Sequence, residues 1–124
     1  MDKTALVVPD IEEGRRFLDL LGKSDIPMNA ALWQRDETFG RWSLIIVTPF
    51  VEKLGVRKTY RRLDQILSRV PDGSPIDLLN VTVLTPDAWF SKSLHRELKN
   101  VKNRAVSGLP VGGQVVDGFI YFVK

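Results

Sequence analysis

Residues 28–48, which read MNAALWQRDETFGRWSLIIVT, decide the fold of this chain. Residues 28–35 alternate between apolar and other side chains in a way that is typical of a β-strand. Residues 41–48 carry apolar side chains on both faces, which is typical of a strand inside a sheet that is covered on both sides. Because the connecting residues 36–40 are short and polar, we expect the two strands to pair as an antiparallel hairpin.

Three helices are expected outside this hairpin. The first spans residues 9–21, because apolar residues recur there at helical spacing and Gly22 is a natural stop. The second follows an apolar stripe over residues 60–70 and ends at residues 71–75, which contain two prolines and a glycine. The third starts at residues 85–87, Thr-Pro-Asp, with a hydroxyl at the N-cap and proline at the first helical position.

The remaining segments read as strands. Residues 76–84 are rich in leucine and valine, as in a buried strand, and residues 104–124 read as strands with turn candidates at residues 112–113 and 117–118. The order is therefore αββαβαβ(β), which predicts an α/β (α+β) single-domain sandwich over residues 1–124. We expect a mixed five- to six-stranded sheet packed against three helices, and its strand–helix–strand connections require at least one parallel pair.

The composition excludes several classes of function. The chain has 124 residues, of which 44% are hydrophobic and 27% charged, with no cysteine and a single histidine. Without cysteine there are no disulfides, thiolate metal sites, iron–sulfur clusters or thiol nucleophiles. No apolar run approaches the roughly 20 residues that span a bilayer, and the first residues do not read as a signal peptide. We therefore expect a cytoplasmic protein that has no membrane partner.

Positive charge is concentrated in two segments of the chain. The net charge is +3 and the pI is about 9.4. Residues 51–70 carry six cations and two acids, and residues 91–104 carry five cations and one acid. At a helical step of about 100° per residue, the cations fall opposite the apolar stripes of the second and third helices. They are Lys58, Arg61, Arg62 and Arg69 on the second helix, and Lys92, Arg96 and Lys99 on the third.

These seven cations are the candidate nucleic-acid-binding residues. If both helices cover the same face of the sheet, the two stripes merge into one positive surface. Such a surface can contact successive phosphates of a nucleic acid backbone. Charge reversal at Arg62 and at Lys99 is then expected to abolish binding. The alternative is an ordinary solvated face, since amphipathic helices carry their charges on the outside. No sequence signature of a known nucleic-acid-binding fold accompanies the cations.

No catalytic constellation is evident in the sequence. His95 is the single imidazole and is predicted on a helix exterior, and neither Gly-x-Ser-x-Gly nor a glycine-rich phosphate loop is present. One histidine without cysteine is too small a set of preferred ligands for zinc. Asp77, Asp87 and Glu97 are the candidate ligands of a less favoured hypothesis, a magnesium-dependent nuclease-like protein. We expect no catalytic residue, no metal ligand and no cofactor, and we favour a protein that is not an enzyme.

A further pattern joins strand and turn positions in the middle of the chain: Ala31-Leu32-Trp33, then Trp42, Leu44, Ile46, Thr48 and Pro49, and later Gly55, Tyr60 and Arg61. This pattern resembles short uncharacterised bacterial α/β proteins that have no assigned activity. The resemblance implies a bacterial origin. It supplies no catalytic residues, because its positions are mostly structural.

The first functional hypothesis is a cytosolic binding or accessory domain that acts through a surface. The edges of the sheet, or the apolar and aromatic residues near Trp33 and Trp42, then pair with a protein partner or with a second copy in a homo-oligomer. The alternative is a nucleic-acid-binding domain that uses the basic faces of the second and third helices. The salt dependence of binding affinity distinguishes the two hypotheses, because affinity for nucleic acid falls steeply as the salt concentration rises.

Overall fold

The computed structural model describes residues 8–35, 40–69 and 78–124. The elements in chain order are α1 (Val8–Lys23), β1 (Ala30–Arg35), β2 (Trp42–Val47), α2 (Phe50–Leu54), α3 (Val56–Leu67), the 3-10 helix η1 (Leu78–Asn80), β3 (Val81–Leu84), α4 (Trp89–Leu98), β4 (Lys102–Val111) and β5 (Gln114–Val123). This is the α+β class expected from the sequence, with one α-helix more than the three expected. The additional helix, α2, has five residues, which are too few to show a helical period in the sequence.

The strands form one mixed five-stranded sheet in the order β3-β2-β1-β5-β4. β1 and β2 pair as the predicted antiparallel hairpin, from Ala30 opposite Val47 to Arg35 opposite Trp42. β2 runs parallel to β3, which confirms the expected parallel pair, while β5 is antiparallel to both β1 and β4. The described part of the chain contains no sixth strand.

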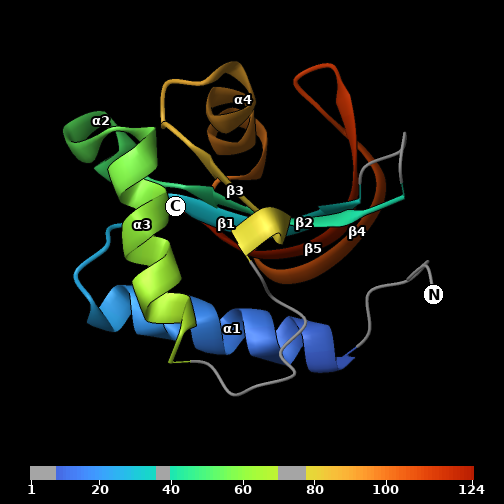
Figure 1. Cartoon of the computed structure of the whole chain (residues 1–124). Helices are drawn as coiled ribbons and strands as arrows, with labels where there is room; N and C mark the ends of the chain where they lie inside the picture. The colour runs from blue at the N-terminus through green and yellow to red at the C-terminus, as the bar shows by residue number, and fades with distance from the viewer. Residues whose placement is uncertain (1–7, 36–39, 70–77) are drawn as a thin grey trace.

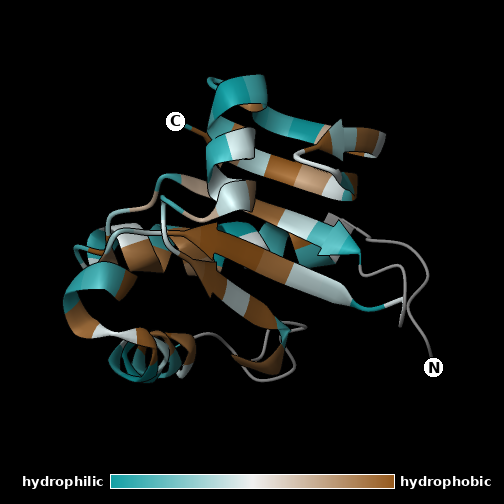
Figure 2. Ribbon diagram, turned by 90° about the horizontal axis from the view of Figure 1, so that it is seen from above, coloured by the Kyte–Doolittle hydropathy of each residue, from teal (hydrophilic) through white to brown (hydrophobic). Residues whose placement is uncertain are grey.

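Helices cover both faces of the sheet, so the domain has three layers (Figure 1). α1 and α3 pack on one face and α4 packs on the other, and each face has its own apolar cluster. Neighbouring residues of β1 and β2 alternate between the two clusters, and Figure 2 shows the central strands largely in brown. The first cluster includes Phe17, Leu21, Trp33, Leu44, Ile46, Leu63 and Ile66, and the second includes Leu32, Ile45, Val47, Phe90, Leu94 and Ile120. No helix among the described residues is long and apolar enough to cross a membrane.

The prediction of a buried strand over residues 76–84 is confirmed in part: residues 81–84 are a strand, but it is shorter than expected and only Val81 in it is fully buried. Residues 78–80 form η1, and β3 lies at an edge of the sheet. Val81 and Val83 pack toward the first cluster, whereas Thr82 between them is exposed on the other face. Residues 76 and 77 lie outside the described residues, as does the predicted helix stop at residues 71–75.

Two predicted helix boundaries are displaced. Gly22 lies within the last turn of α1 and not after it. Thr85 does not cap α4, which begins four residues later at Trp89, with Ala88 at the N-cap and no side-chain cap. The Thr85 hydroxyl instead bonds to the carboxylate of Asp87, and this bond lowers the pKa of Asp87 below its ordinary value. Thr85, a residue type that often caps helices, therefore bonds within the turn that precedes α4.

The last hairpin turns at one of the two predicted positions. Gly112 and Gly113 form the turn between β4 and β5 with positive φ angles of 57° and 83°, a region that favours glycine. The other candidate, residues 117–118, lies inside β5. A Cβ at Gly118 would lie 1.9 Å from the backbone oxygen of Trp33, so this glycine permits close pairing of β5 with β1.

A buried chain of hydrogen bonds joins α1 to the centre of the sheet. Trp33 Nε1 donates to the hydroxyl of Tyr121 at 2.8 Å, and this hydroxyl donates to the backbone oxygen of Ile11 at 2.6 Å. Gly14 makes room for the contact, because a Cβ at this position would lie 2.2 Å from the Tyr121 oxygen. Burial raises the pKa of Tyr121 from 10.0 to about 12, so the phenol keeps the proton that it donates.

Replacing Tyr121 by phenylalanine is expected to lower the free energy of unfolding by about 1–3 kcal/mol, because Trp33 Nε1 and the Ile11 carbonyl lose their partner. The wild-type phenol ionises first in the unfolded chain, so its contribution to stability is complete below pH 10 and is lost as the pH rises through about 12. Urea unfolding across this range, compared between wild type and Tyr121→Phe, measures both effects. Equal stability and an equal alkaline slope in the two proteins would contradict the role of this chain of hydrogen bonds.

Each edge of the sheet carries features that disfavour pairing with another strand over part of its length. At β3, the Tyr60 hydroxyl donates to the Val81 carbonyl at 3.2 Å and accepts from the Val83 N–H at 3.1 Å. At β4, the register shifts between Val106 and Leu109, and Pro110 has no N–H to offer. Partner binding through the sheet edges stays a prediction, which these features disfavour at Val81, Val83 and Pro110.

Tyr60→Phe removes both hydrogen bonds at the β3 edge while it keeps the packing of the ring. We expect the free energy of unfolding to fall by about 1–2 kcal/mol, and we expect concentration-dependent self-association through the uncovered edge. Urea unfolding and light scattering after size exclusion measure the two effects. Arg61→Gln, at the exposed neighbouring position, is the control and should change neither quantity. A stable, strictly monomeric Tyr60→Phe variant would show that the edge does not need this hydroxyl.

Candidate functional site

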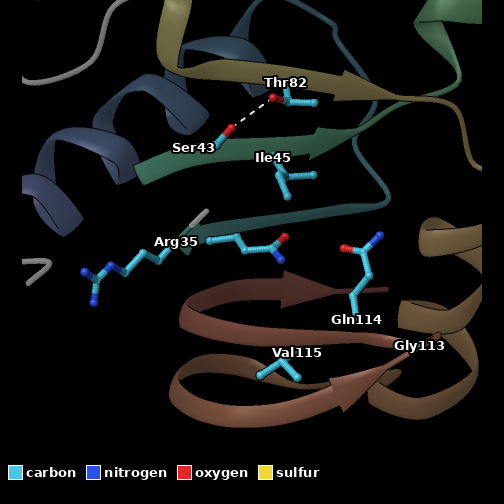
Figure 3. Close-up of a pocket in the computed structure, with 8 residues that line it drawn as sticks. Arg35, Ser43, Ile45, Thr82, Gly113, Gln114 and Val115 are labelled. Atoms are coloured by element: carbon cyan, nitrogen blue, oxygen red, sulfur yellow. Dashed lines mark hydrogen bonds between the residues drawn. The ribbon is translucent and has the colours of Figure 1, made fainter. Parts of the chain in front are cut away.

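A groove lies on the α4 side of the sheet, at the end that α4 does not cover. Ala30 and Val47, at one end of the β1–β2 hairpin, are buried in the cluster beneath α4, whereas Gln34 and Ser43 near the other end are partly exposed. The β4–β5 hairpin curls up beside α4 over this open end (Figure 1). The resulting cavity has a volume of about 490 Å³ and is lined by Gln34, Arg35, Ser43, Ile45, Thr82, Gly113, Gln114 and Val115 (Figure 3).

The lining of the groove is polar and carries little charge. Ser43 Oγ and Thr82 Oγ1 lie 2.9 Å apart and share a hydrogen bond between β2 and β3 (Figure 3). Ile45 supplies an apolar part of the floor, and Gln114 projects from the hairpin toward the strands (Figure 3). Arg35, at the end of β1, is the one charged residue among the described residues that line the groove, and its side chain points away from the other lining residues (Figure 3). The groove can therefore donate and accept hydrogen bonds at several points.

The first turn of α4 holds the tip of the hairpin in place. Trp89 Nε1 donates to the backbone oxygen of Gly112 at 3.0 Å. Gly112 also packs against Ser93, since a Cβ at this glycine would lie 2.4 Å from the Ser93 oxygen. The backbone N–H of Gly108 donates to the Asp117 carboxylate at 2.6 Å, which fixes the β4–β5 pair farther from the tip. These contacts set the width of the groove before any ligand arrives.

Two exposed apolar side chains flank the same turn. Trp89 is 65% exposed and Val115 is 44% exposed, while the Arg96 guanidinium lies 5.7 Å from the centre of the Trp89 ring. Trp89 therefore lies on the surface and not in the core. The predicted aromatic surface near Trp33 and Trp42 does not form, because Trp33 is only 2% exposed and Trp42 packs against the first cluster. The exposed aromatic surface is therefore at α4.

The seven candidate nucleic-acid-binding residues do not form one surface. The cations near α3 and those on α4 belong to helices that cover opposite faces of the sheet (Figure 1). The chain reaches β3 through α3 on one face and leaves it through α4 on the other, so the condition for merging the two stripes is not met. The first group is Lys58, Arg61, Arg62 and Arg69, and the second is Lys92, Arg96 and Lys99; all are exposed except Arg62, which is partly exposed.

The cations of α4 have different basic neighbours. Two further cavities, separate from the groove, contain cations of this region. Lys92 and Lys124 line a cavity beside α4, and Lys124 lines another cavity together with Arg15 of α1 and Lys102 of β4. His95 on α4 bonds through Nδ1 to the backbone oxygen of Lys124 at 2.9 Å. Lys124 thus connects the basic face of α4 with cations from α1 and β4.

The proposed magnesium ligands are not brought together. Asp77 lies outside the described residues. Asp87 precedes α4 and Glu97 lies near its end, so they are separated by at least about 12 Å along the axis at a rise of about 1.5 Å per residue. Among the described residues, no group of three histidine, aspartate or glutamate side chains is placed to hold a metal ion.

The groove was missed in the sequence because its residues come from four strands. The available signal was the polar residues Gln34, Ser43 and Thr82, which interrupt otherwise apolar strands on one face. Which face remains open depends on the position of α4 and the hairpin, and a local pattern does not contain that information. Comparisons with protein-family models, with curated proteins and with solved structures found no match to this chain.

Proposed function

We propose that this chain is a binding domain that captures an extended, acidic segment of a protein partner in the groove beside α4. The observation that carries the proposal is the combination of an open sheet face rich in hydrogen-bonding side chains with two exposed apolar anchors at its rim. The floor is formed by Ser43, Ile45 and Thr82, and the rim by Trp89 and Val115.

An extended occupant suits the floor of the groove. Ser43 and Ile45 are two residues apart on β2, so their side chains share one face and repeat at about 7 Å, the side-chain repeat of an extended peptide. Peptides that bind beside strands gain affinity from main-chain hydrogen bonds and specificity from pockets for alternate side chains. The hydroxyls of Ser43 and Thr82 and the amides of Gln34 and Gln114 offer donors and acceptors for such a main chain.

The rim supplies the apolar part of the interaction. Exposed tryptophan is enriched among residues that dominate binding energy, particularly where the side chain is already ordered. The Trp89 ring is held by its bond to Gly112 and by the Arg96 guanidinium, so little rotational freedom remains to be lost on binding. Val115 lies on the hairpin next to the turn that Trp89 holds.

Charge favours an acidic partner. The Arg96 guanidinium lies beside the exposed Trp89 ring, and no acidic residue is among the described residues that line the groove. The whole chain carries a net charge of +3. Complementary charge accelerates association and discriminates against partners of the wrong sign.

The test is selection of displayed random heptapeptides on the immobilised full chain, followed by affinity measurements with the selected peptides. We expect enrichment of acidic residues beside apolar ones. Thr82→Arg, which fills the groove, should weaken binding by about tenfold or more, because about 1.4 kcal/mol of lost contact corresponds to a factor of ten. Val56→Arg, an equivalent change at an exposed apolar residue on α3, is the matched control.

Arg96→Glu, beside the exposed Trp89 ring, gives a second and independent measure. Selection on this variant should shift the enriched peptides from acidic to basic residues, while the apolar preference remains. The proposal fails if no peptide family is enriched on the wild type. It also fails if the selected peptides bind Thr82→Arg as well as they bind the control.

Nucleic acid binding is a second candidate, and the support for it is the basic surface that joins α4 to Lys102 and Lys124. An exposed tryptophan next to cations is a feature of single-strand binding surfaces, where bases stack on aromatic rings and phosphates meet lysine or arginine. Trp89 with Arg96 has this arrangement. The cations of α3 are not needed, since they lie on the opposite face.

A labelled short single-stranded DNA, titrated at low salt, tests this candidate. Lys99→Glu should weaken binding and lower the slope of log K against log salt by roughly one, because one phosphate contact is lost. Arg62→Glu, on the other face of the sheet, should leave binding unchanged. Equal losses in the two variants, or no binding by the wild type, would exclude a surface centred on α4.

A further inference from the structure

The cavity that Lys124 shares with Arg15 and Lys102 lies on the α1 side of the sheet, beside the start of β4 and the end of β5. It has a volume of about 510 Å³, within the range of small-molecule sites, and it shares no residue with the groove. Its lining comes from three separate parts of the chain: Arg15, Leu18 and Asp19, then Asn100, Lys102 and Asn103, and finally Tyr121, Phe122, Val123 and Lys124.

An irregularity in β5 gives this cavity an aromatic wall. The register between β5 and β1 shifts by one residue, and Tyr121 is the extra residue of the resulting bulge. Neighbours in a regular strand point to opposite faces, but Tyr121 and Phe122 both pack with the first cluster on the α1 side. On β4, Lys102 lies opposite Phe122, and the side chain of Asn103 reaches α1. The bulge therefore brings two adjacent rings to the same side of the sheet as these polar side chains.

Two cations lie over the two rings. The central carbon of the Arg15 guanidinium lies 5.4 Å from the centre of the Tyr121 ring, and the ammonium nitrogen of Lys124 lies 5.5 Å from the centre of the Phe122 ring. Arg15 Nη1 also donates to Asn103 Oδ1 at 2.7 Å. Because these contacts already restrain both side chains, less conformational freedom is lost when a ligand binds to them.

The cations of this cavity have little negative charge near them. Within residues 8–35, 40–69 and 78–124, no salt bridge involves Arg15, Lys102 or Lys124. Asp19 is the one acidic side chain among the described lining residues, against three basic ones. The backbone oxygen of Lys124 bonds to His95 of α4. A cavity whose lining carries an excess of one charge raises the local concentration of ligands of the opposite charge, so this one favours an anion.

The remaining lining is largely apolar. Leu18, Tyr121 and Val123 are buried, and Phe122 is partly buried. Sites for small molecules combine apolar walls with a few polar groups that fix the orientation of the ligand. An inorganic anion would leave the apolar part of a cavity of about 510 Å³ to water. The lining therefore suits a ligand that has an apolar part as well as negative charge.

We propose that this cavity binds an organic anion in which more than one negative charge is joined to an apolar or aromatic body. Arg15, Lys102 and Lys124 hold the charged groups, and the body packs beside the aromatic wall. The bond from Arg15 occupies Oδ1 of Asn103, so the Nδ2 group of this amide is left to donate to the ligand. Asp19 can accept from a hydroxyl or amino group of the same ligand. Phosphate esters and dicarboxylates share this chemistry, because each offers several acceptor oxygens.

A titration of the full chain with phenyl phosphate, followed by ¹H–¹⁵N NMR, tests the site. We expect saturable shifts centred on Arg15, Asn103 and Phe122. The Kd should be at least about tenfold lower than for inorganic phosphate, which lacks the ring, and for benzyl alcohol, which lacks the charge. Equal affinity for phenyl phosphate and inorganic phosphate would overturn the proposal, because the apolar lining would then contribute nothing.

Two variants of β4 distinguish this site from general attraction to a positive surface. Lys102→Gln should raise the Kd for phenyl phosphate by about fivefold, on the scale of one lost charge-assisted hydrogen bond. Arg104→Gln is the matched control, since Arg104 lies outside the lining, opposite Ile120 of the second cluster, and it should leave the Kd unaltered. Equal weakening by the two variants would contradict a site in this cavity.

Asn103→Asp separates binding from folding. Asn103 has a φ of 50°, which aspartate tolerates as asparagine does, and a carboxylate oxygen can still accept the bond from Arg15. The variant should therefore melt at the temperature of the wild type or higher. It should nevertheless bind phenyl phosphate at least about tenfold more weakly, because it adds a negative charge and removes the Nδ2 donor. Undiminished binding by this variant would also overturn the proposal.

Parallel titrations with adenosine 5′-monophosphate and with phthalate identify the kind of anion. Tighter binding of the nucleotide than of phenyl phosphate identifies a nucleotide, and tighter binding of phthalate identifies an aromatic dicarboxylate. Both results support the site, as does a preference for phenyl phosphate itself. Absence of saturable binding for all three anions would remove it.

Discussion

The hydrogen-bond chain from Trp33 through Tyr121 to the carbonyl of Ile11 is the constraint on which the arrangement of this domain depends. It connects the central strand β1, its neighbour β5 and the helix α1 in one buried contact. Buried polar groups specify geometry more strictly than apolar contacts, because each of them must meet its partner at hydrogen-bond distance. Gly14 shows how strict the fit is, since even a methyl group there would occupy the place of the phenol oxygen.

Once α1 and α3 cover one face, the other face is left to α4 alone. α4 is short, with ten residues, and it covers the sheet only in part. The groove that we connect with function lies on this face, next to the turn of the β4–β5 hairpin. α4 contributes to the groove, because Trp89 holds the tip of the hairpin through its bond to Gly112.

The protected edges and the open face are related features of the sheet. Tyr60 occupies the hydrogen-bonding groups of β3, and the bulge and Pro110 disrupt the edge of β4, so strand addition is disfavoured at both sides. Binding through side chains on the open face does not carry the risk of edge-to-edge aggregation. The open face presents polar and apolar side chains without exposing an unpaired strand backbone.

The sequence by itself determined the hairpin of β1 and β2, the positions of the main helices within a few residues, and the α+β class, because these follow from local periodicity and turn chemistry. The sequence also located the two basic stripes, but it did not determine on which face of the sheet each stripe lies. Only the tertiary structure decided that α3 and α4 lie on opposite faces, that Trp89 is exposed and that the groove exists. The reason is that each of these depends on contacts between residues far apart in the chain, such as Trp89 with Gly112 and His95 with Lys124, and no local pattern records which distant segment will be the neighbour.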